Sequence, residues 1–182
     1  MDGRPFRYNI FMARVNIELT DEGGQVIGLE EKYKVHRVPV LLHRAISIVI
    51  YNKDKSEMLI TKRSVKKSTW PYFWSNAVCS HPHPKETYQK AAERRLYEEL
   101  GFRTPLKEIF KFIYEAKMDN GVWGEHEYDV VFVGKCDCRI RPDPKEIAGY
   151  EWLKIGDLEK DLKCNPKKYT PWLKMILEKL KI

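Results

Sequence analysis

Six side chains of this sequence are of types that bind metal ions or transfer protons, and they occur in closely spaced pairs. The pairs are His36 with His43, Cys79 with His81, and Glu125 with Glu127. Imidazoles and carboxylates ligate divalent metal ions, and a thiol near a cation or a metal ion can act in proton transfer. The pattern predicts an enzyme, and Cys79 is the residue that most needs an explanation.

Each of these residues also has an ordinary structural interpretation when it is taken alone. An isolated cysteine such as Cys79 is more often a small buried apolar residue than a catalyst. His36 and His43 could equally be histidines of a strand or of the surface. The enzyme hypothesis therefore depends on the motifs that surround these residues.

The composition favours one domain with an anionic partner. The chain has 182 residues, 43% of them hydrophobic, which is enough for a single core. Its 33 Lys and Arg against 26 Asp and Glu give a net charge of +7, which suits a phosphorylated small molecule or a nucleic acid. Because the basic residues are spread along the chain and mixed with acidic ones, nucleic acid is the weaker of these interpretations.

The cysteines and the first residues indicate a cellular location. The four cysteines form no CxxC pair, so we expect reduced thiols. The first twenty residues carry charges between short apolar stretches, which fits neither a signal peptide nor a membrane span. We therefore expect a soluble, cytoplasmic protein with no membrane partner.

Three pairs of apolar segments flank polar turns and predict antiparallel hairpins. The first pairs residues 15–19 with 26–35, the second 44–51 with 58–61, and the third 110–116 with 128–133. Glu125 and Glu127, just before the segment 128–133, alternate on a strand, so both point to the same face.

Helical periodicity appears in three places. An apolar stripe of Tyr88, Ala92, Leu96 and Leu100 predicts a helix over residues 86–100, with Gly101 as its cap. Arg95 and Glu99 share a neighbouring face of that helix, so it could present a cation and a carboxylate to one site. Two further amphipathic helices are expected over residues 154–162 and 171–181.

The helix over residues 86–100 carries a motif that resembles the Nudix box. The matching pattern is Glu86-x7-Arg94-Arg95-Leu96-x-Glu98-Glu99-x-Gly101-Phe102. In that loop–helix–loop, clustered glutamates hold divalent cations against a diphosphate. Two positions depart from the box: Ser80 stands where it begins with glycine, and Arg95 stands where a metal-binding glutamate belongs. Replacing a carboxylate with a guanidinium compromises the metal site of a hydrolase.

With these departures, the sequence resembles type 1 isopentenyl diphosphate isomerases of the Nudix superfamily rather than Nudix hydrolases. The resemblance spans about residues 26 to 172 and includes, in order, Lys32, His36, His43, the run 61–64, the run 66–71, Cys79-Ser80-His81-Pro82, the degenerate box, 123–127 and Tyr169-Thr170-Pro171-Trp172. It implies an α+β fold, an α/β/α sandwich on a mostly antiparallel, mixed sheet. The expected organisation is a single domain, 1–182, with an N-terminal extension (1–25) and a family-like core (26–172).

The resemblance further implies two metal ions and a diphosphate site. One divalent ion, Zn²⁺, Mn²⁺ or Mg²⁺, would be held by His36, His43, His81, Glu125 and Glu127. A second ion, Mg²⁺, would bridge Glu99 and the substrate diphosphate. Lys32, Arg63 and Lys67 match the family's diphosphate contacts, and Arg95 is a weaker candidate.

The implied reaction converts isopentenyl diphosphate to dimethylallyl diphosphate through a tertiary carbocation. Cys79 and Glu127 would be the acid and base, in an order that the sequence leaves open, with Tyr114 assisting at Glu127. The indole face of Trp172 would stabilise the cation. Residues 1 to 25 are expected to close partly over the site, because the reaction needs a dry pocket.

Two other functions compete with this hypothesis. A Nudix hydrolase is supported by Glu98 and Glu99 and opposed by Arg95. A binding module for RNA is supported only by the charge of +7. The isomerase hypothesis also predicts a monomer that binds a small molecule and no nucleic acid.

Overall fold

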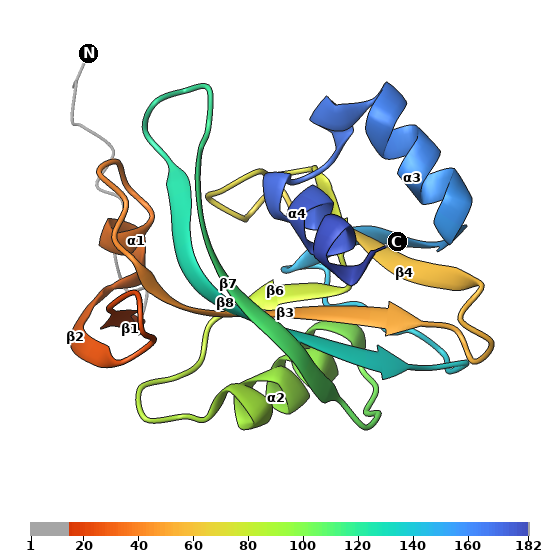
Figure 1. Cartoon of the computed structure of the whole chain (residues 1–182), viewed down its shortest axis with the longest axis horizontal. Helices are drawn as coiled ribbons and strands as arrows, with labels where there is room; N and C mark the ends of the chain where they lie inside the picture. Colours follow the sequence, from red (N-terminus) through yellow and green to blue (C-terminus); the bar gives the residue numbers. More distant parts are fainter. Residues whose placement is uncertain (1–14, 182) are drawn as a thin grey trace, which may run out of the picture.

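Within the part of the chain that the structure describes, a curled sheet of nine strands forms the centre. The computed structural model describes residues 15–181, so residues 1–14 of the expected N-terminal closure lie outside the described part. The central strand β3 (His43–Tyr51) runs parallel to β8 (Gly124–Lys135) and antiparallel to β6 (Val78–Ser80). Figure 1 shows β3 and β8 side by side through the middle of the molecule.

Strand β3 is central because its sequence is apolar and β-branched on both faces. Every residue of β3 is buried, including Ile46, Ile48 and Val49. Strands that are covered on both sides have such continuous apolar runs. The expected hairpin between β3 and β4 (Glu57–Arg63) is present, but the two strands pair over only two positions. These are Ile50 opposite Leu59 and Tyr51 opposite Met58. The parallel pairing with β8 is a feature that the sequence analysis did not predict.

The third predicted hairpin is confirmed and is longer than expected. β7 (Lys107–Lys117) pairs with β8 along most of its length, and the connecting turn contains Gly121 at a φ of 65°. This positive φ favours glycine over residues with a side chain. The hairpin places Glu125 and Glu127 opposite Ala116 and Tyr114.

The first predicted hairpin is also present, with one correction. β1 (Asn16–Thr20) pairs with β2 (Val26–Glu31), and β1 also joins the sheet through Leu19 opposite His43. The expected strand over residues 26–35 ends at Glu31, because the short helix α1 (Lys32–Val35) follows. This helical turn redirects the chain and brings His36 inward.

The second half of the sheet contains strands that were not predicted. β4 diverges from β3 and pairs with β5 (Trp74–Asn76) and with β9 (Ile147–Lys154). β5 and β6 are only three residues long, which is too short for an alternating pattern to be read. β9 has mostly exposed or half-buried residues, so it lacks an apolar run.

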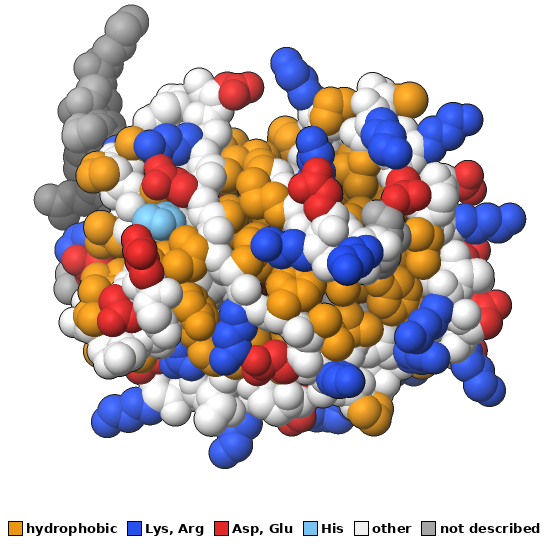
Figure 2. Space-filling model, in the orientation of Figure 1, with side chains coloured by type: hydrophobic (Ala, Val, Ile, Leu, Met, Phe, Trp, Pro, Cys, Tyr) orange, Lys and Arg blue, Asp and Glu red, His pale blue; other side chains and the backbone are white. Residues whose placement is uncertain are grey.

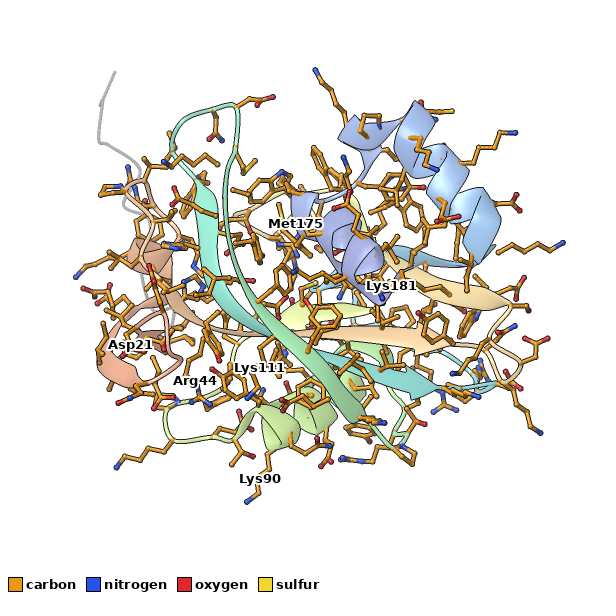
Figure 3. The ribbon with its side chains drawn as sticks, viewed as in Figure 1. Asp21, Arg44, Lys90, Lys111, Met175 and Lys181 are labelled. Atoms are coloured by element: carbon orange, nitrogen blue, oxygen red, sulfur yellow. A yellow bond between two sulfur atoms is a disulfide. The ribbon has the colours of Figure 1, made fainter. Side chains whose placement is uncertain are left out.

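The helices cover both faces of the sheet, which confirms the α/β/α sandwich. α2 (Tyr88–Leu100) packs its apolar stripe on one face, whereas α3 (Ile155–Cys164) and α4 (Pro171–Leu180) cover the other, separated by the turn η1 (Pro166–Lys168). α2 begins two residues later than predicted, after Thr87 accepts a hydrogen bond from the Lys90 amide, and ends at the left-handed Gly101. Met175 of α4, labelled in Figure 3, packs against the apolar cluster between the sheet and the helices α3 and α4.

The side chain of Asp161 connects α3 to the segment before α4. Its carboxylate accepts hydrogen bonds from Lys168 Nζ at 2.7 Å, Tyr169 Oη at 2.5 Å and Asn165 Nδ2 at 2.6 Å. These hydrogen bonds lower the pKa of Asp161, and the bond from Lys168 has the largest effect. The pKa of an aspartate in the unfolded chain is about 3.9. A carboxylate whose pKa is lower in the folded state stabilises the fold at pH values above about 3.9, and this stabilisation is lost progressively as the pH falls below that value.

Asp161→Asn is therefore expected to lower the thermal midpoint by a few degrees at pH 7. The difference from the unchanged chain should shrink as the pH falls to 3, because the Asp161 carboxylate then becomes protonated in the unfolded chain while the folded chain, with its lowered pKa, holds it ionised for longer. Thermal melts followed by circular dichroism at the two pH values measure this. Glu159→Gln on the same helix is the matched control, and an equal pH-dependent difference in that variant would contradict the role assigned to Asp161.

Two further observations concern the expected location. Cys136 and Cys138 are paired as a disulfide, with Cα atoms 5.3 Å apart, a spacing that disulfides use. The expectation of reduced thiols throughout is therefore wrong for this pair, whereas Cys79 and Cys164 are free thiols. Within residues 15–181, none of the helices has the length and apolar character to cross a membrane.

Candidate metal centre and reaction site

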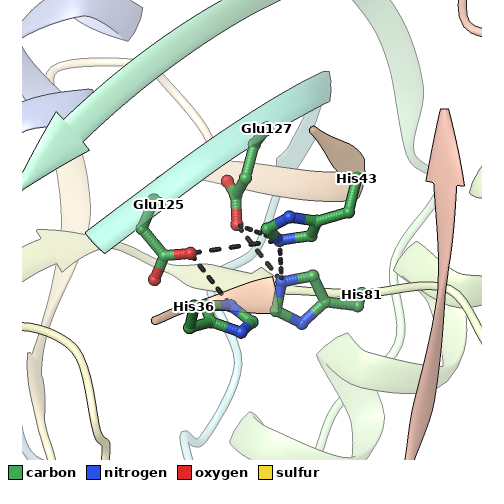
Figure 4. A group of neighbouring side chains, drawn as sticks. All are labelled: His36, His43, His81, Glu125 and Glu127. Atoms are coloured by element: carbon green, nitrogen blue, oxygen red, sulfur yellow. Dashed lines mark hydrogen bonds and ion pairs between the residues drawn. The ribbon is translucent and has the colours of Figure 1, made fainter. Parts of the chain in front are cut away.

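Five side chains from distant parts of the sequence meet at one edge of the central sheet. They are His36, His43, His81, Glu125 and Glu127, and their potential ligand atoms lie within 4.8 Å of one another. Figure 4 shows the imidazoles and carboxylates pointing toward a common centre. These are the residues in which the sequence analysis expected a metal site, and the fold brings all of them together.

The sheet accounts for most of this convergence. His43 begins β3, and the parallel register sets it directly opposite Glu127 on β8. Glu125 lies two residues earlier on β8, so it faces the same side of the sheet. His81 follows β6, whose residue Ser80 pairs with Ile46 of β3. The predicted alternation of Glu125 and Glu127 therefore delivers both carboxylates to the centre.

Backbone carbonyls fix the orientation of two of the imidazoles. Nδ1 of His36 lies 2.6 Å from the carbonyl of Lys32, and Nδ1 of His43 lies 2.7 Å from that of Leu41. Because a carbonyl only accepts, each Nδ1 donates to it, and Nε2 is the ring nitrogen left to face the centre. Histidines that ligate metal ions are commonly held in this way.

The atoms that face the centre are mostly acceptors, which suits a cation. Nε2 of His36 lies 2.9 Å from Oε2 of Glu125, and Nε2 of His43 lies 3.2 Å from Nε2 of His81. Oε2 of Glu125 is buried, and the imidazole nitrogens near it are Nε2 of His36 and, at 4.0 Å, Nε2 of His43. Buried acceptors that face one another need a shared positive charge, so this group can hold a divalent metal ion.

The pKa shifts agree with that role. Burial alone would raise the pKa of Glu125, but the nearby His36 lowers it below its usual value. Burial would lower the pKa of His36, yet Glu125 raises it, so an ion that binds here displaces a proton. Burial and then the charge of Lys32 hold the pKa of His81 well below its usual value. The carboxylate is thus charged and His81 is neutral, as metal ligation requires.

Cys79 lies among hydrogen-bonding groups rather than in a purely apolar core. Its Sγ is 3.0 Å from Oδ1 of Asn76 and 3.0 Å from Nε1 of Trp172. The amide of Asn76 donates to the carbonyls of Ile48 and Val78, so its oxygen is the atom that faces the thiol. Burial raises the pKa of Cys79 to about 11. The thiol is therefore neutral and donates its proton to Asn76.

Tyr114 is a second proton-carrying side chain close to Trp172. Its phenol donates to Oε2 of Glu127 at 2.6 Å, and its ring centre lies 6.0 Å from that of Trp172. Burial and then the charge of Glu127 raise the pKa of Tyr114 well above its usual value, so the phenol keeps its proton. Trp172 thus contacts both proton-carrying groups, Cys79 and Tyr114.

Two of the three expected diphosphate residues, Arg63 and Lys67, border one small cavity, whereas Lys32 does not line it. Arg63, Lys67 and Glu99 line it together with Cys79. Arg63 donates to Thr69, whose hydroxyl in turn donates to Glu125 at 2.6 Å, which links the cavity to the metal-binding group. Lys32 lies at the start of α1; partial removal from water lowers its pKa, and the positive charge of Lys67 lowers it further.

Three residues of the site were missed by the sequence analysis. Asp129 is fully buried and accepts a hydrogen bond from Ser47, and its place two residues after Glu127 on β8 was a usable signal. Asn76, beside the thiol, and Glu146, which pairs with Lys67 and Arg95, carry no periodicity that marks them. Only the fold reveals these two.

Comparison with known proteins identifies the family of the chain. Residues 41–173 match the NUDIX domain. An isopentenyl-diphosphate Delta-isomerase of Nocardia farcinica is 37% identical over 162 residues, which cover 89% of this chain and 92% of that protein. Another, from Halorhodospira halophila, is 35% identical and covers 90% and 93%. The chain belongs to the type 1 isopentenyl-diphosphate Delta-isomerase family of the Nudix superfamily.

Solved structures show that this isomerase family member has the Nudix fold. A crystal structure of a Deinococcus radiodurans protein superposes with a TM-score of 0.67 at 20% identity, covering 82% of this chain and 90% of that chain. A MutT protein from Methanosarcina mazei Go1 gives 0.62 at 19% identity, covering 77% and 93%. At about 20% identity, these two structures show only that the fold is the same. The family assignment comes from the isomerase relatives, which align over about 90% of the chain.

Proposed function

We propose that the chain converts isopentenyl diphosphate to dimethylallyl diphosphate and so supplies precursors for isoprenoid biosynthesis. The observation that carries the proposal is that Trp172 contacts both Cys79 and Tyr114, next to a cavity lined by Arg63 and Lys67. Two proton-transfer groups, one aromatic surface and a cationic anchor are what the shift of a double bond through a carbocation requires.

The proton transfers are assigned to Cys79 on one side and to the Glu127–Tyr114 pair on the other. One group adds a proton to the terminal alkene carbon, and the other removes a proton from C2. Because the reaction is reversible, each group acts as acid in one direction and as base in the other. The pKa of Cys79 and that of Tyr114 are raised, so both groups carry protons, whereas the pKa of Glu127, which burial would raise, is lowered by its hydrogen bonds and nearby His43. In this protonation state the thiol can donate a proton and the Glu127 carboxylate can accept one.

Trp172 is assigned to the stabilisation of the cationic intermediate. Its side chain is 2% exposed and packs edge-on against Trp70, with ring centres 5.3 Å apart. A desolvated indole face stabilises a nearby cation by roughly 2 kcal/mol and offers no lone pair that would trap it. Burial of the same surface also excludes water, which would quench the carbocation.

The proposal includes two divalent ions. His36, His43, His81, Glu125 and Glu127 would hold Zn²⁺, Mn²⁺ or Mg²⁺, and Glu99 would hold Mg²⁺ together with the diphosphate. When bound, these ions neutralise the charge of the carboxylates and of the diphosphate. Lys32, Arg63 and Lys67 are assigned to the diphosphate itself. The proposed enzyme is a monomer, in which one chain supplies every residue assigned here.

Arg95 separates this proposal from hydrolysis. Its guanidinium stands where a hydrolase carries a metal-binding glutamate, and it donates to Glu99 at 2.6 Å and to Glu146 at 2.9 Å. An RNA-binding role gains no support either, because Figure 2 shows basic and acidic side chains mixed over the visible face rather than gathered in a basic patch.

The direct test follows isopentenyl diphosphate by proton NMR in deuterated buffer with Mg²⁺. We expect metal-dependent formation of dimethylallyl diphosphate that carries deuterium in a methyl group. Release of orthophosphate or of a nucleoside monophosphate from a panel of diphosphates, with no isomerisation, would instead identify a hydrolase. The measurement needs only the unchanged chain, so it stands independently of every variant described below.

A further inference from the structure

Glu146 lies where its carboxylate meets the cations of the proposed diphosphate site. It forms an ion pair with Lys67, and its Oε1 lies 2.9 Å from Nη2 of Arg95. That same Nη2 lies 2.6 Å from Glu99. One carboxylate therefore bridges a lysine and an arginine at the point where an incoming anion would be expected to bind.

The space that remains beside Glu146 is too small for a diphosphate. The cavity bordered by Arg63, Lys67, Glu99 and Glu146 has a volume of about 10 Å³, which is room for about one water molecule. A diphosphate group has nine heavy atoms, so it cannot enter while Glu146 bridges Lys67 and Arg95. Substrate binding thus requires that one of these side chains move.

The backbone around Glu146 is fixed, which leaves its side chain as the part that can move. The amide of Glu146 donates to the carbonyl of Asp143, and its own carbonyl accepts from the amide of Ser64. The next residue, Ile147, begins β9 and is buried. The side chain of Glu146 is 26% exposed, so it borders solvent into which it can swing.

We propose that Glu146 is an internal placeholder for the substrate's diphosphate, which holds Lys67 and Arg95 in position in the free protein and is displaced when the diphosphate binds. This rests on the proposed function, because that function defines the anion. A ligand must then bring more negative charge than one carboxylate in order to compete. The site accordingly selects for a multiply charged group and against monoanions.

The charge of Glu146 supports this exchange. Although burial would raise its pKa, the charge of Lys67 and the hydrogen bonds that it receives lower the pKa to about 2. The carboxylate is therefore ionised throughout the neutral range and competes with any anion for the same two cations. Removing the charge should release Lys67 and one of the two carboxylate contacts of Arg95 for the ligand.

Glu146→Gln tests the placeholder by titration with inorganic pyrophosphate, followed by calorimetry first without and then with Mg²⁺. Pyrophosphate should bind roughly tenfold more tightly to the variant, since removing a like charge at a few ångströms in a partly buried site is worth an effect of that size. The KM for isopentenyl diphosphate should fall in parallel, with no rise in kcat. A purely structural role would give neither change.

Glu115→Gln is the matched control, because it removes the same charge from an exposed position on β7 where Glu115 pairs with Lys117. It should leave pyrophosphate affinity unchanged. Glu146→Ala removes the carboxylate without leaving an amide and should tighten binding as Glu146→Gln does. Weaker or unchanged binding in the folded Glu146 variants overturns the placeholder. An absence of isomerisation by the unchanged chain would overturn the proposed function instead, and the pyrophosphate titration distinguishes the two.

Discussion

Cys79→Ala is expected to lower kcat for isomerisation by about 10²–10⁴-fold, the range that a positioned acid or base contributes. The variant removes one of the two proton-transfer groups that contact Trp172 and leaves the other, Tyr114 with Glu127, in place. The KM should change little, because the diphosphate contacts assigned to Arg63 and Lys67 are retained. Steady-state kinetics with isopentenyl diphosphate measure both constants.

The matched control is Cys164→Ala, since Cys164 is the other free thiol and is exposed at the end of α3. Its kcat should equal that of the unchanged chain. Deuterium exchange at C2 of the product provides a second measurement for Cys79→Ala. Without the Cys79 thiol, the exchange of the proton that Cys79 transfers should stop. Full activity in a folded Cys79→Ala variant would remove Cys79 from the mechanism.

Removal of the metal ion is expected to have an effect of comparable size. Dialysis against a chelator should abolish isomerisation, and adding back Zn²⁺, Mn²⁺ or Mg²⁺ one at a time should identify the ion that restores it. His81→Ala should lower metal affinity by at least about a hundredfold, because it deletes one of five converging ligands. Metal content measured by mass spectrometry, alongside activity, separates loss of the ion from loss of the fold.

His83→Ala is the matched control for this experiment, because it removes the same imidazole from an exposed position two residues after His81. It should retain metal and activity. Because an ion that binds the folded state raises the thermal midpoint, metal should stabilise the unchanged chain and His83→Ala but not His81→Ala. An active, metal-free protein would contradict the role of the His and Glu residues.

The sequence predicted those parts of the fold that have a long periodic pattern. The apolar stripe through Leu96 and the glycine cap at Gly101 located α2 to within two residues at its start. In contrast, β5 and β6 have three residues each, too few for a period, and β9 alternates weakly. The four-residue helix α1 begins where a strand was expected, because four residues of helix leave no periodic signal.

The site was predictable where residue type and resemblance coincided. Glu125 and Glu127 alternate on one strand, so their shared face follows from strand geometry alone. The approach of His36 and His81 to them came only from the family motifs, because it depends on α1 and on the pairing of β6 with β3. Glu146 could not be anticipated, since its partners Lys67 and Arg95 lie far away in sequence.

The parallel pairing of β3 with β8 also determines when the protein can acquire its chemistry during synthesis. His43 meets Glu127 only through this ladder, and the intervening chain contributes β4, β5, β6, α2 and β7 before β8 is made. Contacts between such distant segments form slowly. A nascent chain that ends before Glu127 therefore lacks a member of the metal-binding group and leaves β3 without its parallel partner, so most of the domain must be synthesised before the site can form.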